Sequence, residues 1–312
     1  MITNGNKWGV VYCPNHEVFW PKKTREKVEK SLKAHAVDYD FVQSEKKGSV
    51  ARLVKMFINN GYTTIVIVGG DSALNDAANA LMQVEKAVRD RIALGIIPNG
   101  TMNDFAHYWE FKEDDYDRTI EWLKSRRIRK IDLGYIHYQN AQGDTCRRYF
   151  LNCVNIGLVA AITNLRKRTH HFFLGSRALS FIFSFVLMGF QRLEYQMNIR
   201  INSETIKRKV MTVCIGNCQG YGQTPNAVPY NGLLDVSVVC HPQTRQFVFG
   251  IYLFLKGKIL NHRSVLPYRT RRIEVLNSGH APVSIDGRLM RTPVGSFSVG
   301  VEQEVINFII PS

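Results

Sequence analysis

Apolar and polar positions alternate in blocks through the first 130 or so residues of the chain. Short runs of apolar and β-branched residues, bounded by turn residues, are typical of buried strands. Between these runs, apolar residues recur every three or four positions, as on one face of an amphipathic helix. The pattern predicts strands at 8–13, 37–44, 63–70 and 93–98, and helices at 23–36, 48–61 and 72–84. Strands separated by such helices indicate parallel crossover units, and hence a doubly wound α/β domain.

The pattern changes at about residue 131, where strands joined mainly by turns replace the strand–helix alternation. The second half predicts strands at 130–138, 147–157, 195–202, 207–217, 233–240, 271–276 and 281–287, and helices at 175–192 and 244–256. This order favours a β-rich, sandwich-like second domain. We expect an N-terminal α/β domain over residues 1–130, rejoined by a C-terminal strand at about 302–312, and a β-sandwich domain over 131–301.

The composition is that of a globular protein with a strong positive charge. In 312 residues the chain has 41 Lys and Arg against 26 Asp and Glu, a formal net charge of +15. Such a charge attracts polyanions, including nucleotide phosphates, anionic lipid surfaces and nucleic acid, without choosing among them. No apolar run reaches the ~20 residues of a membrane-spanning helix, and the N-terminus lacks the features of a signal peptide. The six cysteines show no disulfide or zinc framework. We expect a cytoplasmic protein.

The segment TIVIVGGDSALNDAANAL, from Thr64 to Leu81, places a carboxylate at the end of a predicted buried strand. Gly69 and Gly70 end the apolar run, and Asp71 leads into the helix. In open α/β sheets, ligands bind beyond the carboxyl ends of the strands, where a glycine turn and a helix N-terminus can approach a phosphate. Asp71 would repel a bare phosphate, so its position indicates a metal ion or a transferable proton. A plain tight turn with Asp71 as a helix cap is the alternative.

A second strand end repeats this arrangement. The segment LGIIPNGTMNDFAHYW, from residue 94, has a predicted strand and a Pro-Asn-Gly turn, and then Thr101, Asn103 and Asp104 at the start of a helix. Because the carboxyl ends of parallel strands meet at one edge of a sheet, we expect the two loops to face one crevice. This set of groups favours a site that uses a nucleotide together with Mg²⁺.

These two segments carry a resemblance to a known family. GGDSALND, from residue 69, resembles the GGDGTxNE motif of the diacylglycerol kinase catalytic family, which also includes sphingosine kinases and bacterial lipid kinases. GIIPNGTMNDFA, from residue 95, is similar to the family's GxxPxGTxNDFA element. The family's later elements follow in order, so the resemblance covers nearly the whole chain: IDLG, NCVNIGL, GNCQGYGQTPNAVPYNGLLDV, LKGKIL and SIDGR.

The resemblance implies an NAD kinase/diacylglycerol kinase-like α/β domain that binds nucleotide, and a C-terminal β-sandwich that helps to bind lipid. The implied activity is that of an ATP- and Mg²⁺-dependent lipid kinase, which transfers the γ-phosphate to the hydroxyl of a lipid alcohol such as diacylglycerol or a sphingoid-type lipid. ATP and Mg²⁺ are therefore the expected cofactors.

The same resemblance assigns roles to individual residues. Those implied for nucleotide binding are Ser44, Gly69, Gly70, Asp71, Ser72, Ala73, Leu74, Asn75, Thr101 and Asn103. The candidate catalytic residues are Asp71, Asp104, Asp286 and Arg288. Val228, Asn231 and Leu233 match a structural Mg²⁺ loop.

The chain departs from the family pattern at positions that bear on catalysis. Arg288 stands where the family's DGE motif has its proposed general base, and an arginine cannot accept a proton at neutral pH. Ser72 and Ala73 replace a Gly and a Thr of the ATP loop, and Asn231 replaces an Asp of the Mg²⁺ loop. Three interpretations stay open: a lipid kinase in which another carboxylate is the base, a nucleotide- or lipid-binding pseudokinase with little turnover, and an NAD kinase-like enzyme.

The expected partners are ATP and a lipid substrate at an anionic membrane surface, to which the protein would bind peripherally. The segment RKRTHHFFLGSRALSFIFSF, residues 166–185, fits either membrane docking or a core helix. The apolar segment 244–257 is interpreted as packing. No nucleic-acid motif accompanies the charge, so no nucleic acid partner is expected. The oligomeric state is left open, a homodimer included.

Overall fold

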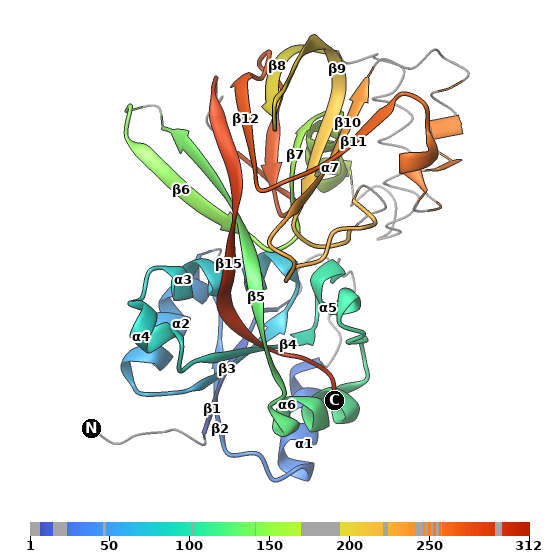
Figure 1. Cartoon of the computed structure of the whole chain (residues 1–312). Helices are drawn as coiled ribbons and strands as arrows, with labels where there is room; N and C mark the ends of the chain where they lie inside the picture. The colour runs from blue at the N-terminus through green and yellow to red at the C-terminus, as the bar shows by residue number, and fades with distance from the viewer. Residues whose placement is uncertain are drawn as a thin grey trace. The chain divides into compact units, whose positions relative to one another are not determined.

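The computed structural model divides the chain into two compact units, Met1–Leu133 with Gln303–Ser312, and Gly134–Glu302 (Figure 1). The structure describes residues 7–14, 24–45, 48–100, 103–140, 142–169, 194–220, 224–240, 246, 249–250, 252–253, 256, 258–290 and 295–312. The helix predicted at 175–192 and much of the one predicted at 244–256 lie outside these residues. Among the described helices, none is long and apolar enough to cross a membrane.

The first unit alternates strands and helices. Its elements in chain order are β1 (Trp8–Tyr12), α1 (Thr24–Ala34), β2 (Tyr39–Gln43), α2 (Ser49–Asn59), β3 (Thr64–Gly69), α3 (Asp71–Met82), α4 (Lys86–Arg89), β4 (Ala93–Pro98), α5 (Asp104–Tyr108) and α6 (Tyr116–Ser125), with the first part of β5 (Ile128–Gln139) and the end of β15 (Phe297–Ile309). Strands β1, β3 and β4 are buried throughout, as their continuous apolar runs predict.

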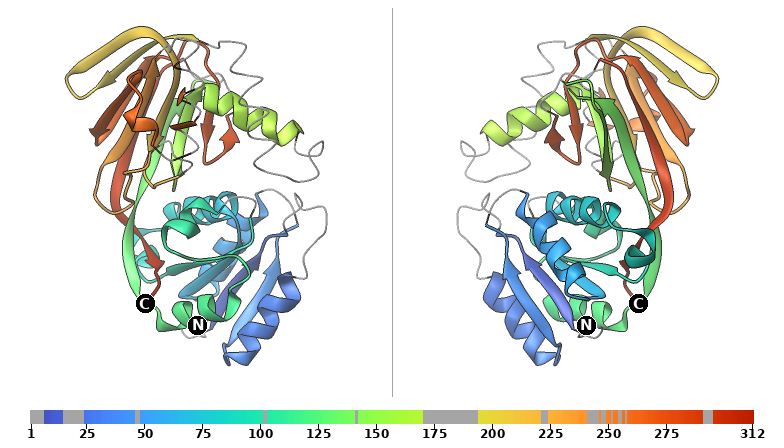
Figure 2. Two further views of the ribbon diagram at one scale, coloured as in Figure 1. Left: turned by 90° about the vertical axis from the view of Figure 1, so that its right-hand side faces the viewer. Right: turned by 90° about the vertical axis from the view of Figure 1, so that its left-hand side faces the viewer.

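The strands of this unit form a parallel sheet in the order β2-β1-β3-β4-β15. Helices cover both faces (Figures 1 and 2). A Cβ at Gly9 would lie 2.6 Å from the Phe57 ring of α2, and a Cβ at Gly95 would lie 2.6 Å from Leu123 of α6. Gly9 of β1 lies beside Ile65 of β3, and Ile65 lies beside Leu94 of β4. Gly95 is one residue further along β4, so side chains at positions 9 and 95 would point to opposite faces of the sheet. Helices α2 and α6 therefore pack on opposite faces, which confirms the predicted doubly wound α/β fold.

The second unit is built mainly of antiparallel strands. Its elements are the remainder of β5, β6 (Thr145–Phe150), β7 (Cys153–Gly157), α7 (Leu158–Thr169), β8 (Tyr195–Ile201), β9 (Glu204–Gly216), β10 (Leu234–Cys240), the 3₁₀ turn η2 (Ile259–Asn261), β11 (Val265–Thr270), β12 (Arg272–Asn277), β13 (Val283–Ile285), β14 (Arg288–Leu289) and most of β15. The strand order is β14-β13-β7-β9-β8-β12-β15; β10 joins β9 to β11, and β5 pairs with β6 and β15.

Alternate residues of these strands point into one apolar core, as the period of two along a strand requires. Strand β8 contributes Met197, Ile199 and Ile201 to this core, and β7 contributes Val154 and Ile156. The predicted β-rich second domain is confirmed.

The structure corrects one predicted strand. The run at 147–157 was expected to be continuous, but it is two strands, β6 and β7, separated by Leu151 and Asn152. The backbone N–H groups at this break donate to a side chain far along the chain, the carboxylate of Asp286, and not to a neighbouring strand. A long-range contact of this kind leaves no trace in the local pattern. Helices α6 and α7 and strand β11 were not predicted.

Candidate nucleotide and catalytic site

The turns after β3 and β4 touch each other at the carboxyl edge of the parallel sheet. A Cβ at Gly100 would lie 2.3 Å from the Cα of Gly70 and 2.7 Å from Oδ1 of Asn103, so only glycine fits there. The backbone N–H of Asn99 donates to the carbonyl of Gly69 at 2.9 Å. The two loops that the sequence placed at one edge therefore lie in direct contact.

Asp71 fixes the start of a helix other than its own. It is the first residue of α3 and its side chain is buried. Its Oδ2 accepts the backbone N–H of Asp104 at 3.0 Å, and its Oδ1 accepts that of Phe105 at 3.2 Å. The N–H groups of a helix's first turn have no partner within the helix. The carboxylate of Asp71 therefore caps α5 and ties the β4 loop to the β3 loop.

Asn103 holds the β4 loop from within. Its buried side chain accepts the Gly100 N–H at 2.9 Å and donates to the Gly100 carbonyl at 3.2 Å and to Oε1 of Glu113 at 2.6 Å. His107 Nε2 lies 3.0 Å from the other Glu113 oxygen. Burial raises the pKa of Glu113, but the bonds from Asn103 and His107 outweigh it, and the pKa lies below its ordinary value. Thr101 lies outside the described residues.

The other predicted nucleotide-binding residues fall into two groups. Ser72, Ala73, Leu74 and Asn75 lie in the first turns of α3, where the last three are buried. Ser72 has no positive φ, so the replacement of a glycine by serine costs no backbone strain here. Ser44 follows β2; its N–H donates to the Tyr12 carbonyl at 2.8 Å, and its Oγ lies 2.7 Å from that of Ser49.

Three further residues at this edge were not singled out from the sequence. Asn99 donates from Nδ2 to the carbonyl of Cys13 at 3.2 Å, which joins the ends of β1 and β4. Burial raises the pKa of the Cys13 thiol to about 12, and the negative charge of Asp76 acts in the same direction. Cys13 is the last residue of one predicted strand and Asn99 directly follows another, so the rule that ligands bind at strand ends could have found both.

Asp286 and Arg288 belong to the second unit, in the short hairpin of β13 and β14. Asp286 and Gly287 form its turn with φ of 42° and 71°, as a type I′ turn requires. The Asp286 carboxylate accepts the N–H groups of Leu151, Asn152 and Cys153 at 2.8, 3.0 and 2.9 Å. Burial raises the pKa of Asp286, and these three donors act in the opposite direction. Arg288 is half-buried in β14, and its backbone pairs with Ile285.

The predicted Mg²⁺ loop closes on its own backbone. The Val228 carbonyl accepts the Tyr230 N–H at 2.8 Å, and Oδ1 of Asn231 accepts the Leu233 N–H at 2.9 Å. The nearby carboxylate of Asp235 is held by Arg269 at 2.7 and 3.2 Å. The described residues contain no group of three or more His, Cys, Asp or Glu side chains that could hold a metal ion.

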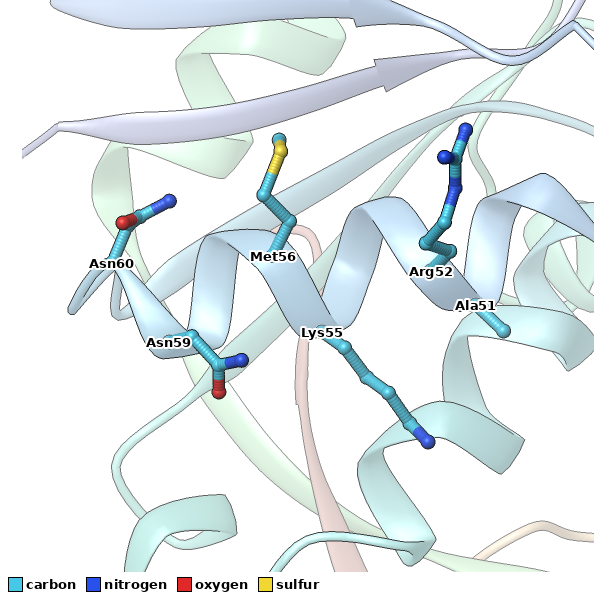
Figure 3. Close-up of a pocket in the computed structure, with 6 residues that line it drawn as sticks. All are labelled: Ala51, Arg52, Lys55, Met56, Asn59 and Asn60. Atoms are coloured by element: carbon cyan, nitrogen blue, oxygen red, sulfur yellow. The ribbon is translucent and has the colours of Figure 1, made fainter.

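A surface hollow of about 570 Å³ runs along α2 (Figure 3). Its lining residues all come from α2 and the position after it: Ala51, Arg52, Lys55, Met56, Asn59 and Asn60. None of them belongs to the loops predicted to bind nucleotide, so this hollow is not the predicted site.

Comparison with known proteins identifies both parts of the chain. Residues 17–136 match the family described as "Diacylglycerol kinase catalytic domain", and residues 152–304 match "YegS C-terminal NAD kinase beta sandwich-like domain". The chain belongs to the diacylglycerol kinase catalytic family, a family of lipid kinases.

Individual relatives agree with this assignment. The chain is 26% identical over 288 residues to "Probable lipid kinase YegS-like" of Shewanella frigidimarina, over 90% of this chain and 87% of that protein. It is 21% identical over 234 residues to "Diacylglycerol kinase" of Bacillus subtilis, over 72% and 71%. A crystal structure of a diacylglycerol kinase from Bacillus anthracis superposes with a TM-score of 0.69 at 18% identity, over 99% of this chain and 98% of the other, which shows a shared fold.

Proposed function

We propose that the protein is an ATP- and Mg²⁺-dependent lipid kinase that phosphorylates the hydroxyl of a lipid alcohol, such as diacylglycerol or a sphingoid-type lipid. The observation that carries this proposal is the joined pair of loops at the sheet edge, where Gly70 meets Gly100 and Asp71 caps α5. Glycine turns of this kind let backbone N–H groups approach phosphate oxygens. The loops lie within the segment that matches the diacylglycerol kinase catalytic domain.

The proposed reaction is a direct phosphoryl transfer. The lipid hydroxyl oxygen forms a bond to the γ-phosphorus of ATP, the bond from that phosphorus to the β–γ bridging oxygen breaks, and ADP leaves. The hydroxyl proton passes to a carboxylate. Catalysis of this kind depends mostly on positioning and on stabilising charge, so loops held as firmly as these suit it.

We assign proton acceptance to Asp104. Arg288 cannot accept a proton. The carboxylates of Asp71 and Asp286 accept two and three backbone N–H groups respectively, and these bonds favour the charged form and make both weaker proton acceptors. Asp104 is the first residue of α5 and is half-buried at the nucleotide edge.

A Mg²⁺ ion bound with ATP would neutralise phosphate charge. Hard oxygen ligands suit it, and Mg²⁺ commonly uses one or two carboxylates together with substrate phosphates. Asp76, half-buried at this edge, supplies such an oxygen and leaves Asp104 to accept the proton. The second metal site, at Val228, Asn231 and Leu233, has weaker support, because Asn231 brings no charge and its Oδ1 already accepts a backbone N–H.

The test is transfer of labelled γ-phosphate from ATP to a lipid extract in detergent micelles, with Mg²⁺ and with EDTA. The expected result is a Mg²⁺-dependent lipid phosphate that Asp104→Asn lowers by about 10²-fold or more. Asp117→Asn, on the exposed side of α6, is the matched control and should keep full activity. A parallel reaction with NAD in place of the lipid extract tests the NAD kinase-like alternative, which a labelled dinucleotide would support.

A nucleotide-binding pseudokinase is the second candidate, and Arg288 is the observation that favours it. It predicts saturable ATP binding by calorimetry with no labelled product from any lipid of the extract. A labelled product that disappears with Asp104→Asn would exclude it.

A further inference from the structure

Two neighbouring aromatic side chains stand out on the surface of the second unit. Phe249 and Tyr252 are 54% and 56% exposed, more than any other large apolar side chain in the described part of the chain. Their rings are stacked, with centroids 6.3 Å apart and planes 24° apart. Because the two rings are adjacent, they form contiguous apolar surface, which is typical of the sites where a protein contacts a partner or a membrane. The sequence had indicated packing for this segment.

Buried contacts hold the segment around Phe249 and Tyr252 against the second unit. Leu253, next to Tyr252, is buried, and its carbonyl accepts the Lys258 N–H at 2.8 Å. The buried His262 ring lies 2.9 Å from the Gln246 carbonyl through Nε2, and its ring centroid is 6.2 Å from that of Phe249. The aromatic pair is therefore held outward by fixed contacts.

The surroundings of the pair are cationic. Lys256, Lys258 and Arg263 are exposed, and the sequence has no Asp or Glu between Val236 and Ile273. Amphipathic surfaces that combine aromatic rings with lysine and arginine bind the interface of anionic membranes. A second copy of this chain would bring cations against cations, which opposes self-association through this face.

We propose that Phe249 and Tyr252, with Lys256, Lys258 and Arg263, form a docking surface for an anionic lipid bilayer. The rings enter the boundary between headgroups and acyl chains, and the cations contact lipid phosphates. The inference rests on the proposed function only in that a membrane lipid is the acceptor; docking itself requires no ATP and no catalysis.

The experiment is co-sedimentation of the full chain, without ATP, with phosphatidylcholine vesicles that contain or lack phosphatidylglycerol. We expect binding to the anionic vesicles that weakens with salt. The double variant Phe249→Ser/Tyr252→Ser should lower the partition coefficient at least tenfold, and Lys256→Gln and Lys258→Gln should each lower it about fivefold. Unchanged binding by the serine variant, or equal binding of the wild type to neutral vesicles, would overturn the proposal.

The matched control is Val88→Ser/Lys86→Gln, which removes an exposed apolar residue and its neighbouring cation on α4 and should leave binding unchanged. The lysine variants alter exposed side chains only, so they test the proposal even where the serine variant fails to fold. Phosphate transfer in detergent micelles is measured separately. If the wild type transfers none but its vesicle binding depends on the aromatic pair, docking stands and the kinase proposal fails. If the double variant Phe249→Ser/Tyr252→Ser lost a dimer of the wild type but still bound vesicles, the docking proposal would be overturned.

Discussion

The carboxylate of Asp71 accepts the backbone N–H of Asp104 at 3.0 Å, so the turn after β3 holds the first turn of the helix that follows β4. The second oxygen of Asp71 holds Phe105 in the same way, at 3.2 Å. A carboxylate is well suited to this place, because the exposed N–H groups of a helix start carry partial positive charge. We infer that Asp71 positions Asp104 for the reaction.

Asp71→Ala should lower both stability and nucleotide affinity. Two buried N–H donors lose their acceptor, and we expect the free energy of unfolding in urea to fall by about 1–3 kcal/mol. Calorimetric ATP titration should show weaker binding, because the β4 loop is no longer held. Asp38→Asn is the control: Asp38 is exposed, its carboxylate lies 3.9 Å from the Lys7 ammonium, and the change should alter stability by less than about 0.5 kcal/mol. Equal effects of the two variants would contradict the capping role.

Gly100→Ala should separate the two loops. The added Cβ would lie 2.3 Å from the Gly70 backbone, which cannot move aside as a flexible side chain could. We expect a loss of about 1–3 kcal/mol of unfolding free energy and a larger relative loss of ATP binding. Gly295→Ala is the matched control, because nothing lies within 4 Å of its Cβ and its φ is not positive. An alanine at 100 that binds ATP normally would show that the loops can part without cost.

The sequence predicts the framework of the first unit well, because each element there is local. The apolar run of β3 is bounded by Gly69, and strand, turn and helix follow in register with the 3.6-residue pattern. Because the carboxyl ends of parallel strands meet at one edge of a sheet, the sequence also predicted that the Gly70 and Gly100 turns lie together, and the structure confirms this.

Contacts between residues distant in sequence could not be predicted. The local pattern does not show that Asp71 caps α5 in place of its own helix. Nor does it show that Asp286 accepts the backbone N–H of Leu151, 135 positions away, at the break between β6 and β7. The exposed pair Phe249 and Tyr252 was missed for a related reason. A run of apolar residues in the sequence does not show which of their side chains the fold leaves exposed to solvent.

Acid should loosen the β4 loop through Glu113. The pKa of Glu113 lies below its ordinary value, so the folded state binds fewer protons than the unfolded state as pH falls. Its contribution to stability is present above about pH 4.3 and is lost as pH falls through the lowered folded-state pKa. Glu113→Gln should therefore flatten the acid limb of the stability profile measured by urea unfolding. Glu121→Gln, on exposed α6, is the control and should leave that limb as it is in the wild type.

Arg288→Glu tests whether proton acceptance limits turnover. The variant restores the carboxylate of the family's DGE motif, and we expect lipid phosphate transfer to rise by about 10²-fold if Asp104 is an inefficient substitute. Lys207→Glu, at an exposed position of β9, makes the same change in net charge and should have no such effect. Turnover and lipid preference that both stay the same in Arg288→Glu would remove Arg288 from the site.

Asn231→Asp should turn a loop that closes on itself into one that binds Mg²⁺. In the wild type, Oδ1 of Asn231 accepts the Leu233 N–H at 2.9 Å; an aspartate keeps that bond and adds the negative charge that Mg²⁺ favours. We expect Mg²⁺ to leave the melting temperature of the wild type nearly unchanged and to raise that of Asn231→Asp by about 2–4 °C, which corresponds to about 1 kcal/mol of ligand-linked stability. Asn226→Asp, an exposed change in the same loop, controls for charge alone. A wild type that Mg²⁺ already stabilises would instead support metal binding by the carbonyl groups of Val228 and Leu233, with Asn231 in place.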